Sequence, residues 1–335
     1  MKAPFVWFGG KRRVAPEVWA ALGDVPNYIE PFAGSLAVLL GRPHDMSNGT
    51  RRAETVNDAD GFLANFWRAL AHDPEAVAHW CDWPVNEVDL FARHLWLVNT
   101  GRSRLLEGME ADPDFYDAQV AGWWVWGVNA WIGSGWCSGD GPWVDTGDGI
   151  GQRPHLGDAG RGVNRQLPHL GDAGRAGYNN MEYRPNVLGY FEELAGRLRD
   201  VRVCCGDWSR VCTSGAMSHG SKVGVFLDPP YLGDVRAADL YAVDDHTIAH
   251  AVRDWCLEHG DDPRLRIVLA GYRAEHDDLM PDTWRRHYYS ASAAYSTTES
   301  AARQDGNHAN RANEVLWFSP HCVTPDRQGE LWEAL

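Results

Sequence analysis

The sequence has few lysines and no long apolar run. Only three of its 31 basic residues are lysine (Lys2, Lys11 and Lys222), and the formal net charge is −15. This acidic balance excludes a protein that coats nucleic acid through charge alone, although it leaves room for a local basic groove. No stretch approaches the roughly 18 uncharged apolar residues that span a bilayer. The first residues, MKAPFVWFGGKRR, lack the apolar segment of a signal peptide.

Cysteine usage and several missing motifs narrow the function further. The seven cysteines are an odd number and include the adjacent pair Cys204 and Cys205, so a disulfide framework is not expected. We expect a reducing cytoplasm, that of a bacterium or of a phage-infected host cell. His72, His79 and Cys81 are close in sequence, but no CxxC pair completes a zinc site, and no metal is expected. The sequence also lacks the GxxxxGK[ST] loop of an NTPase and the GxSxG elbow of a hydrolase.

What is present indicates a folded protein with one or two domains. The 335 residues are 44% hydrophobic and 23% charged, which is typical of a globular chain. Tryptophan occurs 17 times, and nine of these residues lie between Trp80 and Trp143.

Strand and helix patterns alternate at both ends of the chain. Helices are predicted over residues 13–22, 35–41, 61–71, 187–198 and 245–258, with Asp60 as the cap of the third. Strands are predicted over residues 27–30, 53–56, 201–205, 223–227, 265–270 and 313–318. This alternation favours an α/β fold with a mainly parallel sheet covered on both faces. Ligands of such a sheet bind at the carboxyl ends of its strands.

Residues 73–185 interrupt the alternation. They contain the tryptophan-rich stretch WWVWGVNAWIGSGWCSGDGPW, and the octapeptide PHLGDAGR occurs at 154–161 and again at 168–175. Two copies are too few for a repeat protein, so we interpret them as a long surface loop or a duplicated finger. For the tryptophans, we favour the core of a small subdomain over a nucleic-acid surface.

The most specific motif is Asp228-Pro229-Pro230-Tyr231, directly after the apolar stretch VGVFL. The exocyclic amine of a nucleobase is a poor nucleophile, because its lone pair is delocalised into the ring. A carboxylate and a prolyl carbonyl that accept hydrogen bonds from the amine localise that lone pair, and a tyrosine ring stacks on an extruded base. The alternative is a stiff turn made by two prolines.

Three weaker motifs precede it. The turn after Tyr28-Ile29-Glu30, with sequence PFAGS, lets backbone amides approach a nucleotide-like ligand, but such turns are common in α/β proteins. Asp58 ends the next strand, where an acid often holds ribose hydroxyls, although by itself it is better explained as a helix cap. In the segment WFGGK, Lys11 beside two glycines either pairs with a ligand carboxylate or lies in an exposed turn.

Taken in order, the segments WFGGK, EPFAGS, ND, GDW and DPPY resemble the Dam-type DNA adenine-N6 methyltransferases of the alpha motif order. The resemblance covers residues 5–72 and 186–318. It implies a Rossmann-like catalytic domain that binds S-adenosylmethionine, made of residues 1–72 and 186–320. Residues 73–185 would then be an inserted target-recognition subdomain that binds DNA, followed by a tail over 321–335. The segment NRANEVLW at 310–317 resembles the last strand of that domain.

The resemblance also assigns roles to residues. The expected contacts of S-adenosylmethionine are Trp7, Lys11, Glu30, Phe32, Gly34, Asp58 and Asp207. Trp7 and Lys11 would contact its methionine end, Asp58 its ribose and Asp207 its adenine. Asp228, Pro229, Pro230 and Tyr231 match the catalytic motif. One departure is Leu36, where the family usually has a second glycine.

The substrate is expected to be double-stranded DNA, from which one adenine is flipped for methylation at N6. The repeat region is locally basic, because it has five arginines (Arg153, Arg161, Arg165, Arg175 and Arg184) against Asp158, Asp172 and Glu182. Arg153, Arg161, Arg165 and Arg175 are the expected DNA contacts. Cytosine-N4 methylation, methylation of RNA and a DNA-binding relative without catalysis remain open at this point. The residues do not decide the recognition sequence, a role beside a restriction enzyme or the oligomeric state.

Overall fold

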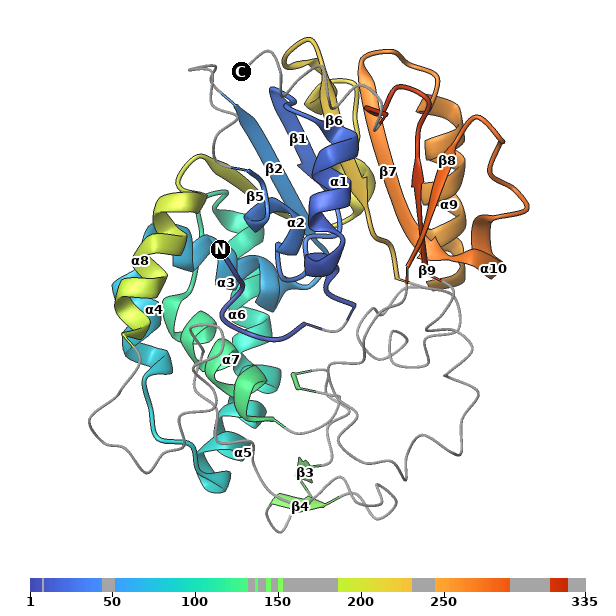
Figure 1. Ribbon diagram of the computed structural model, residues 1–335. Coiled ribbons are helices and arrows are strands. Elements are labelled where there is room, and N and C mark those ends of the chain that lie inside the picture. The colour runs from blue at the N-terminus through green and yellow to red at the C-terminus, as the bar shows by residue number, and fades with distance from the viewer. Residues whose placement is uncertain are drawn as a thin grey trace. The chain divides into compact units, whose positions relative to one another are not determined.

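The computed structural model describes residues 1–7, 9–43, 52–131, 136–137, 143–145, 150–152, 186–230, 245–289 and 314–324 (Figure 1). The chain divides into two compact units. A sheet unit comprises residues 7–57, 207–238 and 243–335, and a helical unit comprises residues 1–6, 58–206 and 239–242.

Six strands of the sheet unit lie in the order β2-β1-β6-β7-β9-β8. They are β1 (Asn27–Glu30), β2 (Ala53–Asp58), β6 (Val223–Leu227), β7 (Leu265–Tyr272), β8 (Arg285–Tyr289) and β9 (Glu314–Phe318). The pairs β1–β2, β1–β6 and β6–β7 are parallel, whereas β9 runs antiparallel to both β7 and β8. β2 continues by one residue, Asp58, into the helical unit. The sheet has a seventh strand, β5 (Val201–Cys205), which is counted with the helical unit.

Helices cover this sheet on both faces. In Figure 1, α1 (Ala15–Leu22) lies in front of the strands and α9 (Asp245–His259) behind them. The short helices η1 (Lys11–Arg13), α2 (Ala37–Leu40), η6 (Trp208–Val211), η7 (Ala216–Ser218) and α10 (Arg273–His276) lie in the connections. β1, β6 and β9 are buried along their whole length, as expected for strands with helices on both sides.

The helical unit packs around α7 (Ala118–Ala130), which contacts α3 (Gly61–His72) and α4 (Pro74–Cys81). Its other elements are α5 (Glu87–Trp96), a π-helical turn over Leu97–Gly101, α6 (Arg102–Ala111), α8 (Val187–Leu198) and a hairpin of β3 (Trp143–Asp145) and β4 (Ile150–Gln152). Trp124 and Trp126 are at most 2% exposed. The interpretation of the tryptophans as the core of a subdomain is therefore confirmed for these residues.

The predicted α/β fold is confirmed, and most predicted elements lie within one or two residues of the observed ones. Asp60 caps α3 through hydrogen bonds from the amides of Phe62 and Leu63, as expected. The prediction missed β8 and did not resolve α4, α5, α6 and α7. The first predicted helix is split, because η1 ends at Arg13 before α1 begins at Ala15. The duplicated octapeptide lies outside the described residues.

Candidate active site

The turn after β1 contains two residues with left-handed backbone conformations. Gly34 has a φ of +47° and Leu36 a φ of +53°. A Cβ on Gly34 would lie 2.9 Å from Nε1 of Trp7, so the indole covers the turn closely and only glycine fits beneath it. The amide of Ala33 donates to the carbonyl of Asn57 at 2.8 Å, which ties the turn to the end of β2.

Leu36 stands where the resembled family usually has a second glycine, and its surroundings show how the turn accommodates a larger residue. It is the N-cap of α2 with a ψ of 28°, and its side chain is 0% exposed. The left-handed conformation costs a residue with a Cβ about 1–2 kcal/mol. Full burial of a leucine side chain contributes about 1.5–3 kcal/mol and offsets that cost. The backbone thus keeps the shape that a glycine would give.

Lys11 connects the first motif to the catalytic motif. Its side chain is 5% exposed, and its ammonium donates to the carbonyl of Gly9 at 2.8 Å. The same Nζ lies 3.0 Å from Oδ1 of Asp228 and 4.0 Å from Oε2 of Glu314. One cation therefore lies between two carboxylates at the carboxyl end of β6, where ligands of parallel sheets bind.

Glu30, at the end of β1, is 2% exposed. Its Oε2 accepts hydrogen bonds from the hydroxyl of Tyr28 at 2.9 Å and from the amide of Leu39 at 3.2 Å. Burial raises the pKa of Glu30 to about 8, the two hydrogen bonds oppose this shift, and the charge of Asp228 adds to it. The carboxyl group thus holds the start of α2 against β1.

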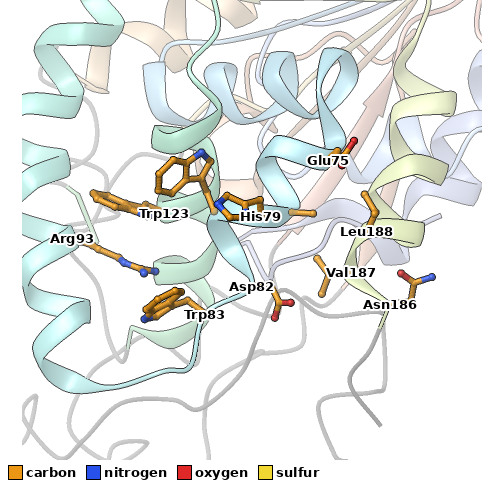
Figure 2. A pocket seen from close by; sticks show the side chains of 11 residues that line it. Glu75, His79, Asp82, Trp83, Arg93, Trp123, Asn186, Val187 and Leu188 are labelled. Atoms are coloured by element: carbon orange, nitrogen blue, oxygen red, sulfur yellow. The ribbon is translucent and has the colours of Figure 1, made fainter. Parts of the chain in front are cut away.

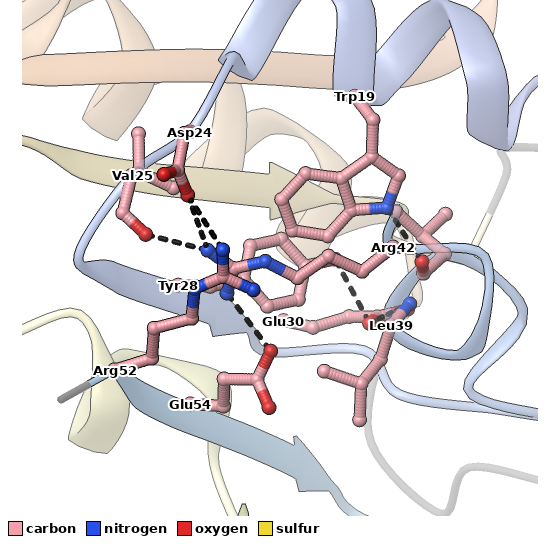
Figure 3. Close-up of polar contacts among 10 residues, drawn as sticks. Trp19, Asp24, Val25, Tyr28, Glu30, Leu39, Arg42, Arg52 and Glu54 are labelled. Atoms are coloured by element: carbon pink, nitrogen blue, oxygen red, sulfur yellow. Dashed lines mark hydrogen bonds and ion pairs between the residues drawn. The ribbon is translucent and has the colours of Figure 1, made fainter. Parts of the chain in front are cut away.

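A neighbouring polar network fixes the same part of the sheet (Figure 3). Arg42 is 4% exposed and donates to Oε1 of Glu54 at 2.8 Å and to the carbonyl of Val25 at 2.6 Å. Its guanidinium also lies 4.8 Å from the ring centre of Trp19, and Asp24 completes the set at 3.4 Å. These contacts join the loop before β1, the end of α2 and β2, and so hold the turn between them in place.

Two aromatic rings stack at the end of the strands. The rings of Phe32 and Trp208 have their centres 6.2 Å apart and are inclined by 27°. Trp255 of α9 meets Trp208 edge-on at 6.4 Å. Asp207 is exposed, and its Oδ1 accepts from the amide of Ser209, which caps η6 and orients the tryptophan that follows. The PFAGS and GDW motifs therefore meet in space.

Asp58 is not the cap of the following helix, since Asp60 has that role. Asp58 is 5% exposed, its Oδ1 accepts from the amide of Asp60 at 2.9 Å, and its carbonyl accepts from the amide of Gly206 at 3.0 Å. These bonds define the backbone at the carboxyl end of β2.

The catalytic motif follows β6 directly. Asp228 is partly exposed, with 20% of its side chain accessible, whereas Pro229 is buried and Pro230 half-buried. Tyr231 lies outside the described residues, as do Arg153, Arg161, Arg165 and Arg175.

The sequence prediction missed two residues of this region. Trp208 belongs to the GDW motif, in which the resemblance assigns a role to Asp207 alone, although an aromatic ring beside a glycine turn is a signal for stacking. Glu314 begins β9 and resembles an ordinary strand residue in the stretch EVLWF. Only the fold places it near Lys11.

Two absences concern the described part of the chain alone. No group of three or more His, Cys, Asp or Glu residues in it is arranged to hold a metal ion. None of its helices is long and apolar enough to cross a membrane.

Comparison with known proteins agrees with this geometry. Residues 7–86 match the family model of the D12 class N6 adenine-specific DNA methyltransferases. The match contains Trp7, Lys11, the turn after β1 and Asp58, and it supports a Dam-type enzyme that methylates adenine N6 in DNA. The mostly parallel seven-stranded sheet fits the Rossmann-like fold of such methyltransferases. No curated protein matches the chain.

Proposed function

We propose that the chain, an adenine-N6 DNA methyltransferase by its match to the D12 class, takes its methyl group from S-adenosylmethionine and acts on an adenine flipped out of double-stranded DNA. The observation that carries this proposal is the position of Asp228. Its carboxylate is partly exposed after a fully buried strand, and Lys11 holds one of its oxygens at 3.0 Å.

The end of the sheet has features that suit S-adenosylmethionine. The stacked rings of Phe32 and Trp208 offer a planar surface for an adenine, and the exposed carboxylate of Asp207 is an acceptor beside it. Gly34 allows close approach of the backbone beneath Trp7. We propose these residues for the donor, with Asp58 for its ribose, Lys11 for its methionine end and Glu30 as the support of the turn. When bound, S-adenosylmethionine supplies a methyl group on a positively charged sulfur, which is a good leaving group.

The protein groups then act on the base. Asp228 and the carbonyl of Pro229 accept the two hydrogens of the N6 amine, so that the nitrogen lone pair is localised. Pro230 stiffens this loop, and Tyr231 stacks on the flipped base. The N–C bond forms as the S–C bond breaks, and the proton that leaves N6 passes to water. Lys11 keeps the carboxylate of Asp228 in one orientation throughout.

The test is a methylation assay with labelled S-adenosylmethionine and unmethylated genomic DNA, followed by digestion to nucleosides and mass spectrometry. We expect N6-methyladenine from the wild-type protein and from Asp261→Ala, a carboxylate exposed elsewhere in the sheet unit. Asp228→Ala should reduce the product at least about a hundredfold. N4-methylcytosine in place of N6-methyladenine would overturn the substrate, and full activity of Asp228→Ala would overturn the site.

A further inference from the structure

The helical unit contains a pocket of about 840 Å³ formed by α4, α5, α7 and the start of α8 (Figure 2). None of the residues proposed for catalysis is among those that line it. Its walls combine three indoles, one guanidinium and two carboxylates, which belong to Trp80, Trp83, Trp123, Arg93, Glu75 and Asp82. Aromatic walls with a few charged groups are typical of sites for small planar ligands.

Arg93 lines this pocket, and one nitrogen of its guanidinium, Nη1, is buried without a hydrogen-bond acceptor among the described residues. Figure 2 shows its guanidinium between the indoles of Trp123 and Trp83, and its Cζ lies 5.2 Å and 5.5 Å from their ring centres. The residue is 9% exposed, and within the described residues its Nη1 has no hydrogen-bond partner. The indole faces attract the cation but do not accept hydrogen bonds from the N–H groups, which point outward in the plane of the guanidinium. A phosphate or carboxylate binds best in that plane.

Trp83 offers a rigid and accessible stacking surface. Its side chain is 50% exposed, and its Nε1 donates to Oδ2 of Asp89 at 2.9 Å, which holds the ring in place. The amide group of Asn86 donates to the same oxygen at 2.6 Å. A large ring fixed in water is suited to stacking with a second planar group.

The charges of the pocket select among planar ligands. Glu75 and Asp82 are both exposed and line the same pocket as Arg93. In Figure 2, Glu75 lies at the end away from Arg93, next to Leu188. A simple anion would be repelled by the two carboxylates. A ligand with an anionic group for Arg93 and amine hydrogens for a carboxylate satisfies both.

We propose that this pocket binds a nucleotide whose base carries an exocyclic amine. The base stacks on the indoles, its phosphate pairs with Arg93, and its amine donates to Glu75 or Asp82. The nucleotide comes either from a DNA strand or from the free pool, which share this chemistry. The proposal stands on the pocket alone and does not depend on the proposed catalysis.

The test is calorimetric titration of the full chain with deoxycytidine monophosphate, which has the phosphate and the amine but is not adenine. Arg93→Gln should weaken binding about tenfold or more through loss of the charge-assisted hydrogen bond. Trp83→Leu changes an exposed residue and should weaken it about fivefold or more through loss of stacking. Arg202→Gln is the control: it removes the same charge from an exposed arginine of β5, in the same unit but outside the pocket lining. We expect it to bind as the wild type does.

Three further ligands test which groups are recognised and where the nucleotide comes from. Deoxycytidine lacks the phosphate and thymidine monophosphate lacks the exocyclic amine, so both should bind more weakly than deoxycytidine monophosphate. A cytosine-containing single strand that competes for the pocket indicates DNA as the source, and failure to compete indicates the free nucleotide. No binding of deoxycytidine monophosphate by the wild type, or equal binding by Trp83→Leu, overturns the proposal. A methylation assay on the same variants separates this outcome from failure of the proposed function.

Discussion

Because Leu36 has a left-handed backbone conformation, we predict that glycine at this position gives a more stable protein than alanine. Inside a helix, a glycine makes the protein about 0.5–1 kcal/mol less stable than an alanine at the same position does. At Leu36, with φ +53° and ψ 28°, alanine retains the left-handed cost of about 1–2 kcal/mol and glycine does not. Both variants lose the contacts of a fully buried leucine, which costs about 2–5 kcal/mol. We therefore expect Leu36→Gly to be the more stable of the two variants by about 1 kcal/mol.

Leu39 is the matched control for this prediction. It lies in α2, three residues after Leu36, and it is also 0% exposed. At Leu39 the usual preference of helices for alanine over glycine should hold, so Leu39→Ala should be more stable than Leu39→Gly by about 1 kcal/mol. Urea unfolding of the four variants, followed by circular dichroism, gives the two differences in free energy of unfolding. If the alanine variant is the more stable at both positions, the assignment of strain at Leu36 is wrong.

Three further predictions concern the sheet unit. Glu314→Gln should lower kcat roughly threefold to tenfold, because Asp228 then becomes the single charged carboxylate beside the Lys11 ammonium and is attracted to it more strongly. Steady-state kinetics measure this change, and an unchanged kcat would show that Glu314 has no such role. Trp208→Leu should weaken S-adenosylmethionine binding about fivefold in calorimetry while kcat at saturating donor stays near the wild-type value, and equal affinity would remove the stacking role. Burial raises the pKa of Glu30 from 4.5 to about 8, so between these pH values the folded protein holds a proton that the unfolded chain releases. As the pH rises through this range, the wild type should therefore lose up to about 5 kcal/mol of stability relative to Glu30→Gln. Urea unfolding across this range gives the difference, and parallel curves would show that Glu30 ionises freely.

The sequence was sufficient for elements whose pattern is local. β6 could be predicted because VGVFL is a continuous apolar run, and α3 because Asp60 precedes an apolar stripe at helical spacing. β8 could not, since its sequence, RRHYY, has no buried face of its own. It forms by pairing with β9, and Arg286 in it is held by Asp277 at 2.8 Å, a contact between separate elements.

The candidate site divides in the same way. DPPY and the turn after β1 were readable because their chemistry lies within a few consecutive residues. The contact of Lys11 with Asp228 and Glu314 joins three distant parts of the chain, so no local pattern shows it. Nothing in the sequence around Arg93 distinguishes it from other arginines, and only its 9% exposure among indoles sets it apart.

The position of β9 has a consequence for how the protein is made. β9 lies between β7 and β8, both of which precede it in the chain, so β8 has no partner among the described strands until residues 314–318 have been synthesised. Glu314, which begins β9, also completes the charge cluster around Lys11. A nascent chain that ends before residue 314 therefore has the turn after β1 but lacks the carboxylate of Glu314 beside Lys11. The pairing of β8 and the full set of charges around Lys11 thus depend on the same short strand.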